Sequence, residues 1–203
     1  MIFEVTKSFV KKELKYAEGG HDWYHIERVY KNALLIAREE KCNITVVKLA
    51  ALLHDIADSK FHDGDETIGP KKAREFLASL SIASEDVEHV VQIIENISFK
   101  GGNFEKTFNS VEFQIVQDAD RLDAIGAIGI ARTFNYGGYK NRSIYNPEIA
   151  PKINMTKEEY KKSEAPTINH FYEKLLLLKD KMNTETGKKL AKNRHVFMER
   201  FLA

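Results

Sequence analysis

The residues best suited to chemistry in this sequence are an adjacent histidine and aspartate, His54-Asp55, at the end of an apolar run. Leu49-Ala50-Ala51-Leu52-Leu53 precedes the pair, and Ile56-Ala57 follows it. Burying a bare carboxylate is unfavourable unless a partner or a metal compensates its charge. His-Asp also occurs at positions 21–22 and 62–63, where glycine and polar neighbours predict loops, so the dipeptide alone is a weak signal. The apolar context therefore indicates a functional pair at His54-Asp55.

Two outlying residues, His25 and Asp120, could complete a metal site with this pair. A metal held by imidazole and carboxylate needs ligands from several elements that converge on one buried point. His25 lies in the first turn of a predicted helix that Asp22 can cap, and Asp120 lies in a later helical segment. Taken singly, His25 and Asp120 are better explained as a cap or surface residue and a solvent-facing acid.

The elements that must position these residues are helices. Apolar residues recur at helical spacing, and no alternating segment is long enough for a confident strand, so we expect an all-α single domain over residues 1–203. The region at about 45–57 is apolar on nearly every side, which predicts a central helix surrounded by others. The predicted helices are 2–17, 22–43, 45–57, 70–80, 84–97, 110–131 with a bend near 118–123, 167–182 and 184–202, and a long loop covers 135–156.

Composition narrows the classes of function. The chain has 31 basic and 30 acidic residues and a net charge of +1, which argues against an extended nucleic-acid surface but allows a pocket for a small anion. No apolar stretch is long enough for a membrane-spanning helix. The single cysteine, Cys42, and the lack of a charged-then-apolar leader predict a protein of the reducing cytoplasm.

Three separated motifs carry a family resemblance. They are His25-Ile26-Glu27-Arg28-Val29, Leu52-Leu53-His54-Asp55-Ile56 and Ala119-Asp120-Arg121-Leu122. Their order and flanks resemble the HD-domain metal-dependent phosphohydrolases, and closely resemble the small stand-alone microbial members. The resemblance covers roughly residues 20–150, and the closing helices at about 156–203 are compatible with it. It implies an all-helical fold, in agreement with the periodicity.

The resemblance implies four metal ligands: His25, His54, Asp55 and Asp120. Asp118 and Asp123 lie close enough in sequence to replace Asp120, which we prefer because Arg121-Leu122 follows it as in the family motif. The bound ion would be one divalent metal: manganese, magnesium, cobalt, iron, nickel or zinc.

The resemblance also implies a catalytic residue, and the chemistry of a phosphorylated substrate suggests where it would bind. Asp58, three residues after Asp55, matches the acidic residue that several members place near the attacking water, and a loop carboxylate is an equal alternative. A phosphorylated substrate needs cations, and the long loop could cover a base. The candidate substrate-binding residues are Arg28, Lys60, Arg121, Tyr139 and Arg142.

The expected function is a metal-dependent phosphohydrolase acting on a small nucleotide. It would either cut a nucleoside triphosphate to release pyrophosphate or remove phosphate from a monophosphate. The alternatives are a cyclic-nucleotide phosphodiesterase and a non-catalytic module that senses nucleotides or binds a partner. An apolar terminal helix face could close the core or form a homo-oligomer, and the sequence leaves both open.

Overall fold

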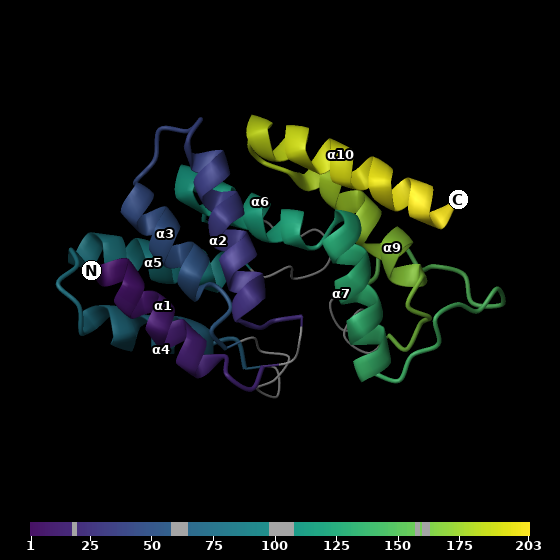
Figure 1. Ribbon diagram of the computed structural model, residues 1–203, viewed down its shortest axis with the longest axis horizontal. Coiled ribbons are helices and arrows are strands. Elements are labelled where there is room, and N and C mark those ends of the chain that lie inside the picture. The colour runs from purple at the N-terminus through teal and green to yellow at the C-terminus, as the bar shows by residue number, and fades with distance from the viewer. Residues whose placement is uncertain (18–19, 58–64, 98–107, 157–158, 160–162) are drawn as a thin grey trace. The chain divides into compact units, whose positions relative to one another are not determined.

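The protein is built from helices. The computed structural model describes residues 1–17, 20–57, 65–97, 108–156, 159 and 163–203 (Figure 1). Within these ranges no residue forms a strand, which confirms the all-α prediction. The elements are α1 (Ile2–Glu13), α2 (Trp23–Ala37), α3 (Ile44–Leu53), α4 (Ile68–Ala78), α5 (Ser84–Ile97), α6 (Val111–Asp123), α7 (Gly126–Tyr139), α9 (Asn169–Glu173), the 3-10 helix η2 (Leu175–Lys181) and α10 (Glu185–Leu202).

The chain forms two compact units. The first holds α1 to α5 and the part of α6 up to Ala119, and the second holds the end of α6 from Asp120 with α7, α9, η2 and α10. Whether the two units act as one domain, as the sequence suggested, stays a prediction. None of the helices formed by the described residues combines the length and apolarity needed to cross a lipid bilayer.

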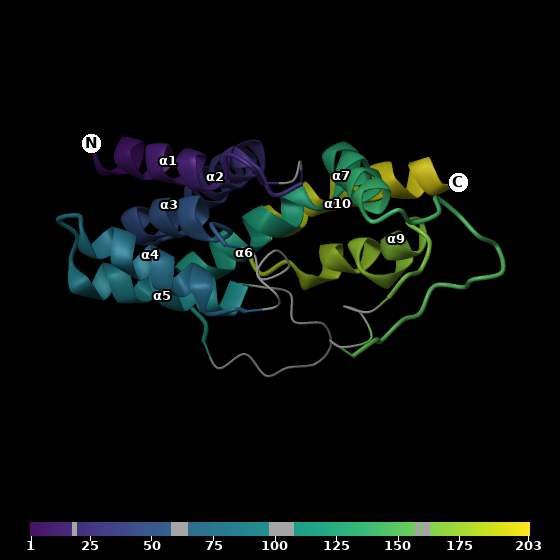
Figure 2. The same ribbon diagram turned by 90° about the horizontal axis from the view of Figure 1, so that it is seen from below.

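Helix α3 is the core of the first unit, as its apolar sequence predicted. Every residue from Val46 to Leu53 is buried except Lys48, and α3 packs against α1, α2 and α5. Figure 2 shows α3 between α1 and α2 on one side and α4 and α5 on the other. Asn43 begins the helix, because its side-chain oxygen accepts hydrogen bonds from the backbone N–H groups of Thr45 and Val46 at 3.1 and 3.3 Å.

The helix that ends at the His-Asp pair is shorter than predicted. The sequence favoured helix to Ala57, but α3 ends at Leu53 and residues 54–57 form turns. His54 is therefore the C-cap residue of α3, and Asp55 lies just beyond it. A chain that leaves its helix at this point can direct two consecutive polar side chains without the 100° separation that continued helix imposes.

The long helix predicted over residues 110–131 is two helices. Helix α6 ends at Asp123, and α7 begins at Gly126, whose φ of +76° lies in the left-handed region. A side chain at Gly126 would also place its Cβ 3.0 Å from Cβ of Arg194, which is a tight contact, so the backbone conformation and the space both favour glycine here. The bend expected near residues 118–123 is thus a break immediately after them.

The predicted loop starts later than expected. Helix α7 continues to Tyr139, so residues 135–139 are helical, and the prediction of a loop from Asn135 was wrong there. Glycine is typical of loops, but Gly137 serves a close approach inside the second unit, because a Cβ at this position would lie 2.3 Å from Oγ1 of Thr167. From Lys140 the chain leaves the helix, and the N–H groups of Thr167 and Ile168 bond back to the carbonyl oxygens of Ser143 and Ile144.

Of the two helices predicted for the closing segment, one differs from the structure. The continuous helix predicted over residues 167–182 is instead the short α9 followed by η2, joined at Lys174 with φ −142°. The last helix was predicted correctly, and α10 starts after Thr184, whose hydroxyl accepts a hydrogen bond from the Gly187 N–H at 2.9 Å. Within the second unit, α10 packs against α7 and η2.

Candidate metal centre

His54 is held in one tautomer by its own helix. Its side chain is buried, and Nδ1 lies 3.0 Å from the carbonyl oxygen of Ala51, one turn back along α3. A carbonyl oxygen can only accept, so Nδ1 carries the hydrogen and donates it. The other nitrogen, Nε2, is then left with a lone pair, as in histidines that bind a metal and give their second nitrogen to a carbonyl oxygen.

His25 presents its ring to His54 from the first turn of α2. Asp22 is the N-cap of α2, and its carboxylate accepts the backbone N–H of His25 at 3.0 Å, which confirms the predicted cap. His25 is buried, and its Nε2 lies 3.3 Å from Nε2 of His54, with the two rings inclined at 66°. Two imidazole nitrogens on one ion, each about 2.0–2.1 Å away, would lie about 2.8–3.4 Å apart. The pair therefore fits a shared metal.

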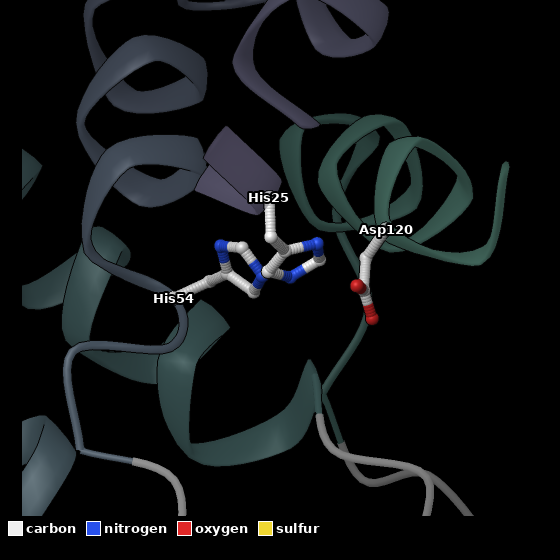
Figure 3. Close-up of side chains that lie close together, drawn as sticks. All are labelled: His25, His54 and Asp120. Atoms are coloured by element: carbon white, nitrogen blue, oxygen red, sulfur yellow. The ribbon is translucent and has the colours of Figure 1, made fainter. Parts of the chain in front are cut away.

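Asp120 supplies the carboxylate of this group. It follows Ala119 on the uninterrupted helix α6, and ligand atoms of His25, His54 and Asp120 all lie within 4.8 Å of one another (Figure 3). Two neutral nitrogens and one carboxylate oxygen are a donor set that divalent transition metals accept. These three residues could hold a metal ion.

Asp55, the fourth ligand implied by the resemblance, lies beside the group. Its Oδ2 is 3.8 Å from Nε2 of His25, and its side chain is 16 % exposed. This places a second carboxylate against the same ring nitrogen that faces His54. Coordination by Asp55 stays a prediction.

The two alternatives to Asp120 occupy other parts of α6. Asp118 is fully buried, and two residues along a helix it projects about 200° away from Asp120. Asp123 is buried too, and its Oδ2 accepts a hydrogen bond from Nη1 of Arg132 at 2.8 Å in a close ion pair. Of these three acids, only Asp120 belongs to the group formed with the two histidines among the described residues.

One positioning contact was not found from the sequence. The side-chain amide of Asn32 on α2 reaches the carbonyl oxygen of Ala119 on α6 at 3.5 Å, a weak hydrogen bond between two residues 87 positions apart. It ties the helix of His25 to the residue preceding Asp120. Nothing in the local sequence around Asn32 distinguishes it from an ordinary polar residue of a helix.

The predicted catalytic and substrate-binding residues lie in several parts of the chain. Asp58 and Lys60 lie outside the described residues. Arg28 is on α2, three residues after His25 and so on a neighbouring part of the same helix face. Arg121 is anchored through Nη1 to the carbonyl oxygen of Lys181, a contact between positions 60 apart.

Two further predicted substrate residues, Tyr139 and Arg142, lie at the end of α7 and in the loop that follows it. Tyr139 is the last residue of α7, 58 % exposed, with Nζ of Lys140 5.4 Å from its ring centroid. Nη2 of Arg142 donates a hydrogen bond to the carbonyl oxygen of Ser163. Arg142 thus fastens the loop to the later chain, a structural role that the sequence did not suggest.

Comparison with known proteins places this site in a family. The model of the HD domain matches residues 22–125, which include His25, His54, Asp55 and Asp120. A crystal structure from Lactobacillus plantarum is 38% identical, with a TM-score of 0.85 over 98% of this chain and 92% of that one. An HD-superfamily hydrolase from Bacillus thuringiensis is 45% identical, with a TM-score of 0.76 over 98% and 92%.

A third similar structure contains a nucleotide. Bacillus subtilis YpgQ, crystallised in complex with ADP, is 34% identical, with a TM-score of 0.76 over 98% of this chain and 93% of YpgQ. The family match, the identities and the near-complete coverage agree with the motifs His25, His54-Asp55 and Asp120. The chain therefore belongs to the HD-domain phosphohydrolase superfamily.

Proposed function

We propose that this protein is a metal-dependent phosphohydrolase that acts on a small nucleotide. The observation that carries the proposal is the grouping of His25, His54 and Asp120, with the two Nε2 atoms at 3.3 Å. The ADP complex of YpgQ supports a nucleotide ligand, and the net charge of +1 favours a small molecule over a nucleic-acid polymer.

The number of phosphates in the ligand of YpgQ bears on which bond of the substrate is hydrolysed. ADP carries two phosphates, so the YpgQ complex favours a substrate with a phosphate chain over a monophosphate. Our preferred reaction is therefore attack of water on the α-phosphorus of a nucleoside triphosphate, which breaks the bond to the β-phosphate and gives a monophosphate and pyrophosphate. Release of phosphate from a nucleoside monophosphate is the second candidate.

The protein's own residues would prepare this reaction. A divalent metal bound by His25, His54 and Asp120 would lower the pKa of a bound water and neutralise phosphoryl charge. The bond from His54 Nδ1 to Ala51 keeps Nε2 available as a ligand, and the Asp22 cap fixes the turn that carries His25. Asp55 is proposed as the fourth ligand and Asp58 as the group that takes the proton of the attacking water.

The proposed substrate contacts are cations and one aromatic ring. Arg28, close to His25 on α2, and Lys60 would balance phosphate charge, and Arg121 would do so next to Asp120. The exposed ring of Tyr139 offers a face on which a base can stack. Arg142 is assigned to the loop contact with Ser163 in preference to substrate binding.

Product analysis tests the proposal. The protein is incubated with nucleoside tri-, di- and monophosphates and with cyclic nucleotides, in the presence of manganese, magnesium or cobalt, and phosphate and pyrophosphate are measured separately. We expect pyrophosphate from triphosphates. Phosphate from monophosphates would establish the second candidate, and cleavage of cyclic nucleotides would establish a phosphodiesterase instead. Metal and nucleotide binding with no turnover would refute the enzyme and favour a sensing module.

Variants distinguish a loss of the metal site from a general loss of the fold. His54→Ala removes one nitrogen ligand and should abolish metal retention and hydrolysis together, and Asp55→Ala should do the same if Asp55 is a ligand. His89→Ala is the matched control, because His89 lies on α5 in the same unit and its Nε2 bonds to Oγ of Ser110 at 2.8 Å. A His54→Ala protein that keeps its metal and its activity would contradict the assignment.

A further inference from the structure

The first turn of α6 is hydrogen-bonded to the start of α3. Glu112, in the first turn of α6, is 9 % exposed, and its Oε1 accepts the backbone N–H of Asn43 at 2.7 Å. The two residues are 69 positions apart. Because Asn43 is the N-cap of α3, the carboxylate lies at the positive end of that helix, where charge-assisted hydrogen bonds are strong. One short bond therefore joins the starts of two helices.

Helix α5 is linked to the same place. Nδ2 of Asn43 donates a hydrogen bond to Oδ1 of Asp86, in the first turn of α5, at 2.8 Å. The second carboxylate oxygen of Glu112, Oε2, lies 3.6 Å from Nε2 of His89 on α5, which is beyond hydrogen-bond distance. Asn43, Asp86 and Glu112, here named the helix-start junction, thus connect α3, α5 and α6 inside the first unit.

The two helices that start at this junction also carry two of the candidate metal ligands. His54 is the C-cap residue of α3, about three turns after Asn43, and Asp120 follows Glu112 by about two turns on α6. Ligand atoms of His54 and Asp120 belong to the group that lies within 4.8 Å (Figure 3). Helices α3 and α6 are therefore joined at their starts and meet again at the candidate metal centre.

The junction supplies a directional contact that apolar packing lacks. Phe113, Val116 and Ala119 bury one face of α6, but the hydrophobic effect is not directional and sets the position of a helix along its axis only loosely. A metal site needs ligand distances within about 0.2 Å of their proper values. The hydrogen bond from Asn32 to Ala119 is weak at 3.5 Å, so the 2.7 Å bond of Glu112 is the better candidate for fixing α6.

We propose that Glu112 is a positioning residue for the metal centre: its bond to Asn43 fixes α6 along its axis and so places Asp120 against the two histidines. The inference rests on the proposed function, because it assumes that the group holds a metal. It makes metal affinity depend on a side chain about two turns away from the nearest ligand. In the sequence, Glu112 is indistinguishable from an ordinary acid in the first turn of a helix.

Metal binding to the full chain tests this role without turnover. Manganese chloride is titrated by calorimetry into the metal-free wild-type protein and its variants, and far-UV circular dichroism confirms that each variant is folded. Glu112→Leu removes the acceptor, and Glu112→Gln is the conservative variant that keeps an oxygen for the Asn43 N–H. The matched control is Glu85→Leu, which replaces an exposed acid in the first turn of α5.

We expect the dissociation constant for manganese to rise about tenfold in Glu112→Leu, as when groups that orient metal ligands are removed. It should change less than about twofold in Glu112→Gln and in Glu85→Leu. A merely structural role would lower the unfolding midpoint of Glu112→Leu and leave the manganese affinity of the folded protein unchanged. Unchanged affinity in folded Glu112→Leu, or an equal loss in Glu85→Leu, would overturn the inference.

A second variant decides the question if Glu112→Leu does not fold. Glu112→Asp keeps the negative charge at the start of α3 but is one methylene too short to hold the same bond without moving α6. We expect its dissociation constant for manganese to rise about threefold, and an unchanged value would overturn the positioning role.

Metal binding and hydrolysis are scored separately, so the two proposals remain distinguishable. If the wild-type protein hydrolyses nucleotides and Glu112→Leu binds manganese normally, the positioning role is refuted and the hydrolase stands. If manganese affinity depends on Glu112 but no nucleotide is hydrolysed, the hydrolase is refuted and the positioning role stands. A wild-type protein that binds no manganese, magnesium or cobalt would refute both.

Discussion

The buried ion pair between Asp123 and Arg132 should contribute strongly to the stability of the second unit. Nη1 of Arg132 on α7 donates to both Oδ2 and the carbonyl oxygen of Asp123, at 2.8 and 3.2 Å. The side chains are 1 % and 17 % exposed for Asp123 and Arg132. Arg132→Met keeps the apolar stem but leaves a buried carboxylate without this partner. We therefore expect a large loss of stability.

The size of the stability loss in Arg132→Met depends on the burial of the pair and on a neighbouring charge. Breaking one side of a buried pair costs about 3–5 kcal/mol. Burial lowers the pKa of Arg194 on α10, and the negative charge of Asp123 acts in the opposite direction, so Arg194 is a second cation that interacts with this carboxylate. This remaining cation partly compensates the carboxylate, so the lower end, about 3 kcal/mol, is expected for Arg132→Met. For a chain of this size that corresponds to a Tm lowered by about 6–12 °C.

An exposed pair provides the matched control. Nη1 of Arg74 lies 2.6 Å from Oε2 of Glu88, a shorter distance than in the buried pair, but the side chains are 48 % and 49 % exposed. Arg74→Met should cost much less stability than Arg132→Met, because solvent screens both charges of the exposed pair. The comparison therefore isolates burial, since the same substitution is made in both pairs.

Urea denaturation followed by far-UV circular dichroism measures both variants. A third variant, Asp123→Leu/Arg132→Met, removes both charges and should recover much of the stability lost in Arg132→Met. If Arg132→Met were within about 1 kcal/mol of the wild type, or no worse than Arg74→Met, the argument from burial would be refuted.

Two further predictions concern backbone conformation and pH. Gly126→Ala should destabilise the protein by about 1–2 kcal/mol because it forces a side chain into positive φ, whereas Gly138→Ala, in the same helix with nothing within 4 Å of the added Cβ, should be neutral or stabilising; equal midpoints in thermal unfolding would contradict this. Hydrogen bonds from Lys152 and then Thr156 lower the pKa of Glu159 from 4.5 to about 2. Its folded-state pKa is depressed, so its stabilising effect is present above pH 4.5 and is lost as the pH falls towards 2. Lys152→Met should raise the Glu159 pKa in a carboxyl-carbon NMR titration, and an unmoved titration curve would show that the Lys152 contact is absent in solution.

Helix content and the central position of α3 could be predicted from the sequence because they depend on neighbours within a turn or two. Val46 to Leu53 are apolar on nearly all sides, which requires a helix surrounded by others, and Asp22 caps α2 through a bond to a residue three positions away. The motifs that identify the family are local as well. They indicate candidate metal-binding residues, but not the distances between them.

Contacts between residues far apart in the sequence could not be predicted and are seen only in the tertiary structure. At the break between α6 and α7, Arg194 donates a hydrogen bond to the carbonyl oxygen of Leu122, 72 positions earlier, and packs against Gly126. The close approach of Thr167 to Gly137, which leaves no room for a Cβ there, is likewise a contact between distant residues. Helix periodicity cannot reveal either contact, because both arise only when the closing segments fold back onto α7.

The candidate site, too, was predicted from the sequence only in part. The sequence determined that two histidines and several aspartates lie at the ends of apolar helices, where burial demands a compensating partner. Only the tertiary structure placed the His25 and His54 nitrogens 3.3 Å apart, selected Asp120 over Asp118 and Asp123 for their group, and anchored Arg121 to Lys181. The physical reason is that side-chain identity is a local property of the chain, whereas convergence of ligands depends on helix packing between residues far apart in sequence.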